Sequence, residues 1–237
     1  PYSLYKEHGV RRYGFHGTSH YYVAGEAAKM LGKERDQTNV ISAHLGNGCS
    51  VCAIKDGKSV DTSMGLTPLE GLVMGTRSGS IDPGLFTFLT QQLNYSVQEI
   101  DDLLNKQSGL LGISELSNDC RTIEEAAVEG HPQANLALDI FCYRLAKQIA
   151  AFLVPVQRLD ALIFTGGIGE NSDIIRDKVI TQLGFLGLEC DEAANLAARF
   201  GKEGLISKGQ THAKAFVIPT NEEWVIANDA ARIAKEG

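Results

Sequence analysis

Two apolar segments that run into glycine-rich turns limit the folds open to this chain of 237 residues. LDALIFTGG (159–167) has the nearly continuous apolar character of a buried parallel strand. NVISAHL (39–45) is also strand-like. It is followed by CSVCAIKDG and KSVDTS, which read as a hairpin with its tight turn at Asp56 and Gly57. Three strands in a row, and a buried strand later in the chain, predict a fold with a mixed sheet.

Helical patterns occupy most of the remaining chain. The first helix is expected to start after an N-cap at Thr18 or Ser19 and to stop at Gly32, whereas PYSLYKEHG before it reads as a polar loop. A further apolar strand is expected at 213–220. Other helices are expected at 84–93, 97–107, 132–154, 171–184 (capped by Asn171 or Ser172) and 221–236. The order of three strands, helices, and then strand, helix, strand, helix is typical of an α/β domain.

Charge and cysteine usage exclude several classes of function. The net charge is −7 with no long run of Lys and Arg, which disfavours a nucleic-acid or anionic-membrane surface. The longest apolar stretches, such as AAFLVPV (150–156), are too short to span a bilayer. Five irregularly spaced cysteines and the lack of a signal-peptide pattern predict reduced thiols in a cytoplasmic protein, and the opening residue Pro1 suggests processing or a fragment.

The pair Cys49 and Cys52 has the spacing of a zinc or redox motif. On a strand, however, residues three apart face opposite sides of the sheet. No second pair of Cys or His lies at zinc-ligand spacing in the sequence. The pattern therefore favours two small strand residues over a metal site.

The turn Gly46-Asn47-Gly48 follows the first strand directly. Its glycines allow backbone N–H groups to approach phosphate oxygens closely, and Asn47 and His44 can add side-chain donors. A plain hairpin, whose glycines only satisfy a positive φ, explains the turn equally well.

A second glycine cluster, TGGIGEN (165–171), lies between the buried strand and the next helix, where ligands of α/β sheets gather. Neither cluster completes the dinucleotide fingerprint, because Val51 and Ser172 stand where its third glycine is needed. This absence disfavours an NAD-dependent oxidoreductase. Two glycine turns after two strands favour nucleotide binding of another kind.

Three other sites carry candidate charges. Arg77 lies on a glycine-rich stretch, either as a clamp for phosphate or carboxylate or in a surface ion pair with a neighbour such as Asp82. His16 lies beside a helix start, where it can donate to an anion, whereas His20 on that helix is equally well a partly buried histidine. Glu222 or Glu223, after the last strand, fits water-mediated Mg²⁺ binding or a helix first turn.

Taken together, the segments HGTSH, HLGNG, DTSMGLTPLEGLVMGTRSGSIDPG, FTGGIGENS and IPTNEE resemble the acetate kinase family, in the family's order and over nearly the whole chain. The resemblance implies a ribonuclease-H-like (actin-like ATPase) domain with inserted helices. It also implies reversible transfer of the γ-phosphoryl group of ATP to acetate, giving acetyl phosphate. Mg²⁺ would be the cofactor and a homodimer the assembly.

The resemblance also implies roles for individual residues. His16 and Arg77 would face the transferring phosphoryl group and the substrate carboxylate, and Glu222, chosen over Glu223, would be the Mg²⁺-linked carboxylate. Cys49 stands where other members often carry glycine, at a position that is not catalytic. The nucleotide would be bound by the segments around HLGNG, SNDCR and GGIGEN, namely His44, Leu45, Gly46, Asn47, Gly48, Asp119, Cys120, Arg121, Gly167, Ile168, Gly169, Glu170 and Asn171.

Members of the family also carry an N-terminal domain with an early asparagine, serines, a substrate-side arginine and an acidic catalytic residue, for which this sequence has no counterpart. We therefore interpret residues 1–38 as a linking segment and residues 39–237 as the C-terminal nucleotide-binding domain. The chain alone is expected to bind nucleotide but to be catalytically incomplete. Propionate or butyrate kinase activity, and a non-catalytic nucleotide-binding module, remain as alternatives.

Overall fold

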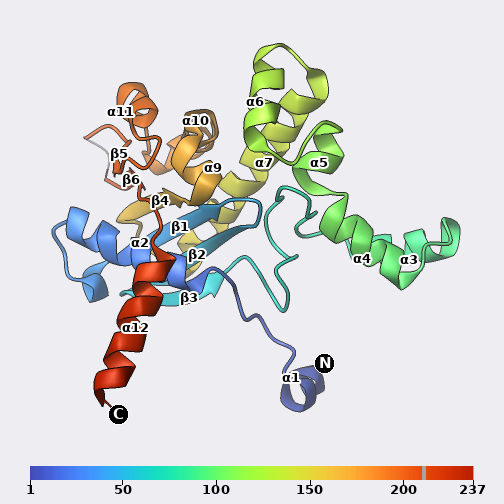
Figure 1. The fold of residues 1–237 in the computed structure, drawn as a ribbon, viewed down its shortest axis with the longest axis horizontal. Helices are drawn as coiled ribbons and strands as arrows, with labels where there is room; N and C mark the ends of the chain where they lie inside the picture. Colours follow the sequence, from blue (N-terminus) through green and yellow to red (C-terminus); the bar gives the residue numbers. More distant parts are fainter. Residues whose placement is uncertain (210–211, 237) are drawn as a thin grey trace.

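The computed structural model describes residues 1–209 and 212–236, which fold around one six-stranded sheet with helices on both faces (Figure 1). The order of strands across the sheet is β3-β2-β1-β4-β6-β5. β1, β4 and β6 are parallel, whereas β2, β3 and β5 pair antiparallel with their neighbours, so the sheet is mixed as predicted. The strands are β1 (Val40–Leu45), β2 (Cys49–Lys55), β3 (Lys58–Thr62), β4 (Ala161–Thr165), β5 (Gly204–Leu205) and β6 (Lys214–Val217).

Helices precede β1, follow β6, and occupy the connections between β3 and β4 and between β4 and β5. They are α1 (Tyr2–His8), α2 (Gly17–Met30), α3 (Gly84–Gln92), α4 (Val97–Lys106), α5 (Gly109–Ser114), α6 (Cys120–Val128), α7 (Pro132–Ala151), α8 (Leu153–Val156), α9 (Gly166–Asn171), α10 (Asp173–Gln182), α11 (Glu192–Ala197) and α12 (Glu222–Glu236), with 3-10 turns at Arg35–Gln37 and Gly184–Leu186.

Alternation along β1 divides the core into two layers. Ile41, Ala43 and Leu45 belong to the larger cluster, which packs against α7 and its neighbours, whereas Val40 belongs to the smaller cluster under α2. Because successive strand residues face opposite sides, Ser42 and His44 share the α2 face with Val40. Polar groups are thus placed between α2 and the sheet, at the carboxyl end of β1.

The hairpin turn forms at the predicted residues, since Asp56 and Gly57 both have positive φ angles (50° and 72°). The α2 cap differs from the prediction, because His16 is the N-cap, with a φ of 58°, and the helix starts at Gly17.

Three further segments differ from the sequence-based expectations. PYSLYKEHG, expected as a loop, forms α1, which ends at His8 and has Gly9 as its C-cap with a φ of 65°. The expected helix 132–154 is α7 followed, after Phe152, by the short α8. The second glycine cluster is not an open turn but the short helix α9. Tertiary hydrogen bonds to α9, described below, outweigh the low helix propensity of glycine.

Three segments extend away from the sheet in Figure 1, namely the N-terminal helix α1, the arm formed by α3 and α4, and the C-terminal helix α12. α12 contacts α2 through a T-shaped pair of Tyr22 and Trp224 with ring centroids 5.7 Å apart. Within the described residues, no helix is both long enough and apolar enough to cross a membrane.

Candidate active site

The two glycine segments lie on one cavity of about 890 Å³. β1 and β4 are adjacent and parallel, so their carboxyl ends meet at the same edge of the sheet. Gly46 and Asn47 reach the cavity from the loop after β1, and Gly167 and Ile168 reach it from α9 after β4. The predicted residues among those that line it are Gly46, Asn47, Asp119, Cys120, Arg121, Gly167, Ile168 and Asn171.

The other predicted nucleotide residues lie behind or beside this wall. Leu45 is buried in the larger core cluster, and Gly169 is buried where an added Cβ would lie 3.4 Å from the backbone of Phe164. Glu170 binds backbone groups, as described next. His44 and Gly48 do not line the cavity and belong to a second group of residues, described below.

α9 is held against the end of the sheet by close backbone contact and by buried polar groups. Gly166 has a φ of 77°, and a Cβ there would lie 2.8 Å from the carbonyl oxygen of Leu45, so only glycine fits this position. Glu170 Oε1 accepts hydrogen bonds from the backbone N–H groups of Gly166 (2.9 Å) and Thr220 (3.2 Å). This single carboxylate oxygen joins the end of β4 to the segment after β6.

Arg176 supports α9 from the core. Its side chain is fully buried, and its guanidinium donates to the carbonyl oxygen of Gly169 (2.9 Å) and to Asn195 and Ala198 beyond α10. Burial lowers the pKa of Arg176 to about 10. The cavity wall formed by α9 is therefore supported by a buried cation whose N–H groups are hydrogen-bonded.

The start of α6 forms the opposite wall. Asp119 caps this helix by accepting from the backbone N–H of Arg121 (2.9 Å), and Asn118 Nδ2 donates to Asn47 Oδ1 (3.2 Å). Glu124, one turn further along α6, accepts a hydrogen bond from Ser172 Oγ, and burial raises the pKa of Glu124. Hydrogen bonds thus tie the start of α6 and the residue before its cap to Asn47 and to Ser172, which follows α9.

A second group of side chains surrounds Gly48. The rings of His16 and His44 are stacked with centroids 4.1 Å apart. A Cβ added at Gly48 would lie 3.3 Å from Arg77 Nη1 and 3.6 Å from His16 Nε2, so both polar groups approach the same backbone. Arg77 donates to the carbonyl oxygen of Pro68 (3.2 Å). Among the residues the structure describes, its guanidinium makes no ion pair with Asp82, the surface alternative.

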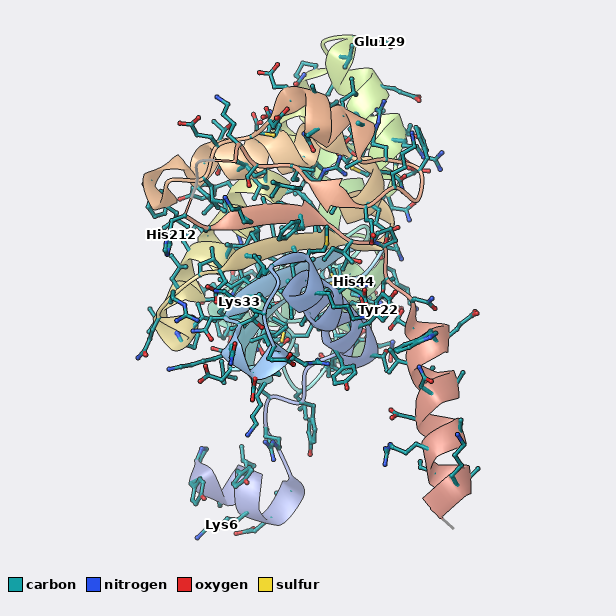
Figure 2. The ribbon with its side chains drawn as sticks, turned by 90° about the vertical axis from the view of Figure 1, so that its left-hand side faces the viewer. Lys6, Tyr22, Lys33, His44, Glu129 and His212 are labelled. Carbon is teal, nitrogen blue, oxygen red and sulfur yellow. The ribbon has the colours of Figure 1, made fainter. Side chains whose placement is uncertain are left out.

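The histidines of this group are held neutral. Burial lowers the pKa of His16, and Arg77 adds to this effect while Glu222 opposes it. Burial and the neighbouring His16 lower the pKa of His44 to about 4. Figure 2 shows His44 among the side chains where α2 meets the sheet. At neutral pH, therefore, Arg77 supplies the positive charge and the histidines supply neutral donors.

Glu222 is the acidic group that faces these residues. Its Oε1 accepts from Thr18 Oγ1 (2.8 Å), and its carboxylate acts on the pKa values of both His16 and His44. It is half-buried, whereas Glu223 is exposed. Nearby, Thr220 Oγ1 is buried and has no hydrogen-bond partner within the described part of the chain. Oxygen groups of this kind fit Mg²⁺, which takes one or two carboxylates and completes its shell with water and phosphate.

Cys49 and Cys52 lie in the two different core clusters and so face opposite sides of the sheet, as the strand geometry predicts. Burial raises the pKa of Cys49 to about 12 and that of Cys52 to about 11. All five cysteines of the chain are free.

The sequence patterns missed several residues of the site. Glu124, Ser172, Arg199 and Phe200 line the cavity, although no glycine or strand end marks them. SNDCR was found only through the family resemblance, but Asp119 before an apolar-periodic helix is a recognisable N-cap signal. Ser42 and Ser50, which contact the histidines, carry no sequence signal of their own, and Ser19 was expected only as a helix cap.

This sheet order, with the cavity at the carboxyl ends of its parallel strands, is that of a ribonuclease-H-like α/β domain. The Acetokinase family model matches residues 1–228, and the chain belongs to that family.

Known members of the family support this assignment. The chain is 65% identical to the acetate kinase of Shewanella loihica over 235 residues, which cover 99% of the chain and 59% of that protein. Its structure is similar to that of Porphyromonas gingivalis acetate kinase, with a TM-score of 0.95, 47% identity, and coverage of 99% of this chain and 58% of that one. It is also similar to a propionate kinase from Francisella tularensis, with a TM-score of 0.90, 51% identity, and coverage of 96% and 57%. The chain thus spans about 59% of the length of the curated relatives it matches.

Proposed function

We propose that the full-length protein is an acetate kinase, which transfers the γ-phosphoryl group of ATP to acetate and reverses the reaction from acetyl phosphate and ADP. One observation carries the proposal. The two glycine segments share a cavity, and the next residue after Asn47, Gly48, is flanked by Arg77 and His16. A nucleotide bound in the cavity would direct its phosphates toward a cation and neutral donors.

The residues present suit phosphoryl transfer, in which positioning and charge stabilisation do most of the catalysis. The equatorial oxygens of the transferring group carry dispersed negative charge in the transition state, and Arg77 and His16 would donate to them. The backbone of Gly46-Asn47-Gly48 would bind the phosphates that remain on the nucleotide. His44, stacked on His16, would add a second neutral donor.

Glu222 would hold Mg²⁺ through water, and the ion, when bound, neutralises charge on the phosphates. This carboxylate lies on the histidine side of the site, within electrostatic reach of His16 and His44. Replacing Glu222 with Gln is expected to raise the Mg²⁺ concentration needed for half-maximal activity, whereas Glu223→Gln, at the exposed neighbour, is the matched control.

The chain by itself is proposed to be the nucleotide-binding part of this enzyme, with residues 1–38 linking it to a further domain. It is expected to bind ATP or ADP and to form negligible acetyl phosphate, because substrate and catalytic groups on a second domain have to close over the nucleotide. Acetyl phosphate formation by the 237 residues alone, at the rate of the full-length protein, would contradict this part of the proposal.

Calorimetry with Mg-ATP tests nucleotide binding directly. Gly167 lines the cavity and a Cβ there meets no atom within 4 Å, so Gly167→Val is expected to narrow the cavity. Gly184 is equally unobstructed but does not line the cavity, and Gly184→Val is the matched control. Binding should be lost in the first variant and kept in the second. Equal ATP affinity of the two variants would show that the nucleotide does not bind in this cavity.

Propionate kinase is the second candidate, because the Francisella tularensis protein of that name shares 51% identity with this chain. Butyrate would be the next longer acyl substrate. The kcat/KM values of the full-length protein for acetate, propionate and butyrate separate these possibilities. A protein that binds nucleotide and turns over none of the three would instead be a non-catalytic nucleotide-binding module.

We also propose that the protein is a homodimer. The arm of α3 and α4 leaves large apolar side chains exposed, among them Phe88 (52%), Leu93 (50%) and Val97 (65%). Extended apolar surface of this kind typically marks a protein interface. Sedimentation of the full-length protein at micromolar concentration measures the assembly, and a monomer there would refute it.

A further inference from the structure

A row of polar side chains is buried between α2 and the sheet, at the end nearest Gly48. Ser50 Oγ lies 2.9 Å from His16 Nδ1 and 2.8 Å from His20 Nε2. On its other side, His20 Nδ1 lies 2.7 Å from Ser42 Oγ. His20 is 4% exposed and both serines are fully buried. We call the chain of hydrogen bonds His16–Ser50–His20–Ser42 the serine–histidine relay.

The direction of these bonds follows from counting hydrogens. A hydroxyl has one hydrogen, and a neutral imidazole has one N–H and one unprotonated nitrogen. Among the described residues, Ser42 Oγ forms its hydrogen bond with His20 Nδ1. The buried hydroxyl hydrogen of Ser42 is therefore paired only when Ser42 donates it to that nitrogen. The proton of His20 therefore lies on Nε2 and is donated to Ser50.

The hydrogen bond from His20 to Ser50 also determines the direction of the bond between Ser50 and His16. Its oxygen accepts from His20, so its own hydrogen has one acceptor left, which is His16 Nδ1. His16 consequently carries its proton on Nε2, the atom that approaches Gly48 beside Arg77. The opposite direction would leave the hydrogen of Ser42 unpaired in the interior, which folded proteins avoid.

We propose that His20 is a positioning residue that acts through Ser50 to hold His16 as the neutral Nε2–H tautomer, so that His16 presents a hydrogen-bond donor to a phosphoryl oxygen. This inference rests on the proposed function for the identity of the acceptor. The tautomer itself follows from the contacts alone. Burial lowers the pKa of His20 to about 3, which keeps the middle of the relay neutral.

A second, separate contact gives the same result at the neighbouring ring. Ser19 is fully buried and its Oγ lies 2.8 Å from His44 Nδ1, so donation by Ser19 places the proton of His44 on Nε2 as well. Each of the stacked rings then carries an N–H donor at Nε2, and the Glu222 carboxylate acts electrostatically on both rings. Donation at this site requires no protonated histidine.

Histidine ¹⁵N NMR of the chain tests the tautomer without any ligand. We expect the Nδ1 resonance of His16 in the range of an unprotonated nitrogen and Nε2 in the range of an N–H, with assignment by a His16→Gln variant. In Ser50→Ala, both resonances should move toward the values of a tautomer mixture. Ser59→Ala, at an exposed serine outside the relay, should leave them unchanged. The proposal is overturned if His16 carries its proton on Nδ1, or if its ¹⁵N resonances do not change in Ser50→Ala.

Kinetics of the full-length protein give the second readout. Ser50→Ala should lower kcat roughly tenfold, the size of one orienting hydrogen bond, with little change in the KM for ATP. Ser50→Thr keeps the hydroxyl and should restore most of the loss. If Ser50→Ala does not fold, the parent spectrum and the threonine variant still decide the question.

The outcomes separate the inference from the proposed function. Absence of phosphoryl transfer in the full-length protein, together with an Nε2–H tautomer of His16, refutes the function and leaves the relay. Normal transfer by Ser50→Ala refutes the positioning role of His20 in the reaction and leaves the proposed function.

Discussion

Acid should destabilise the folded chain through His20. This side chain is 4% exposed, and burial lowers its pKa from about 6.5 to about 3. Between these two pH values the unfolded state binds a proton that the folded state does not, so the free energy of unfolding falls as the pH falls. For a single group with these two pKa values, lowering the pH from 7 to 5 removes about 2 kcal/mol of stability. Below about pH 3 both states are protonated and the dependence on this group ends.

Urea unfolding at a series of pH values measures this loss. His20→Gln removes the titrating group, so the difference in pH slope between parent and variant isolates its contribution, whatever stability the variant loses at neutral pH. His44, whose pKa is lowered to about 4, adds a contribution of the same sign to both proteins and cancels in the difference. Parallel slopes for parent and variant between pH 7 and pH 5 would refute the reasoning.

Three further predictions follow from the site and its supports. Arg77→Ala in the full-length protein should lower kcat by about two to three orders of magnitude with little change in ATP affinity, and comparable turnover would exclude its role at the phosphoryl group. Arg176→Met should lower the free energy of unfolding in urea by about 3–5 kcal/mol, because buried carbonyl groups including that of Gly169 lose their donor; a change below about 1 kcal/mol would contradict this. Gly166→Ala should cost about 1–3 kcal/mol, because alanine is strained at a φ of 77° and its Cβ meets the backbone of Leu45. Gly167→Ala, which meets no neighbour, is the control and should be neutral or slightly stabilising.

Much of the sheet was predictable because its information is local. The apolar run that becomes β4 and the turn at Asp56 and Gly57 are both readable from a few neighbouring residues. The parallel arrangement of β1 and β4 then follows from the intervening helices, and it brings the two glycine segments to one edge. The existence of a shared cavity was therefore implied by the pattern, although its walls were not.

The remaining parts depend on contacts between distant segments. α9 is rich in glycine and reads as a turn, but the hydrogen bond that Glu170 accepts from Gly166 and the one that Arg176 donates to Gly169 stabilise it as a helix. β5 has two residues and exists only as a partner of β6. The relay needs Ser42 and Ser50 on the same face of two paired strands and His20 above them, an arrangement that only the strand register and the docking of α2 determine.

The shared hydrogen bonds of Glu170 have a mechanical consequence. One oxygen binds the first residue of α9 and also the backbone of Thr220, two positions before Glu222. A ligand that pushes α9 outward must either pull the base of the C-terminal helix with it or break one of these bonds. Displacement of α9 by a ligand is therefore expected to be felt two residues before Glu222, through the single hydrogen bond that the backbone of Thr220 donates to Glu170.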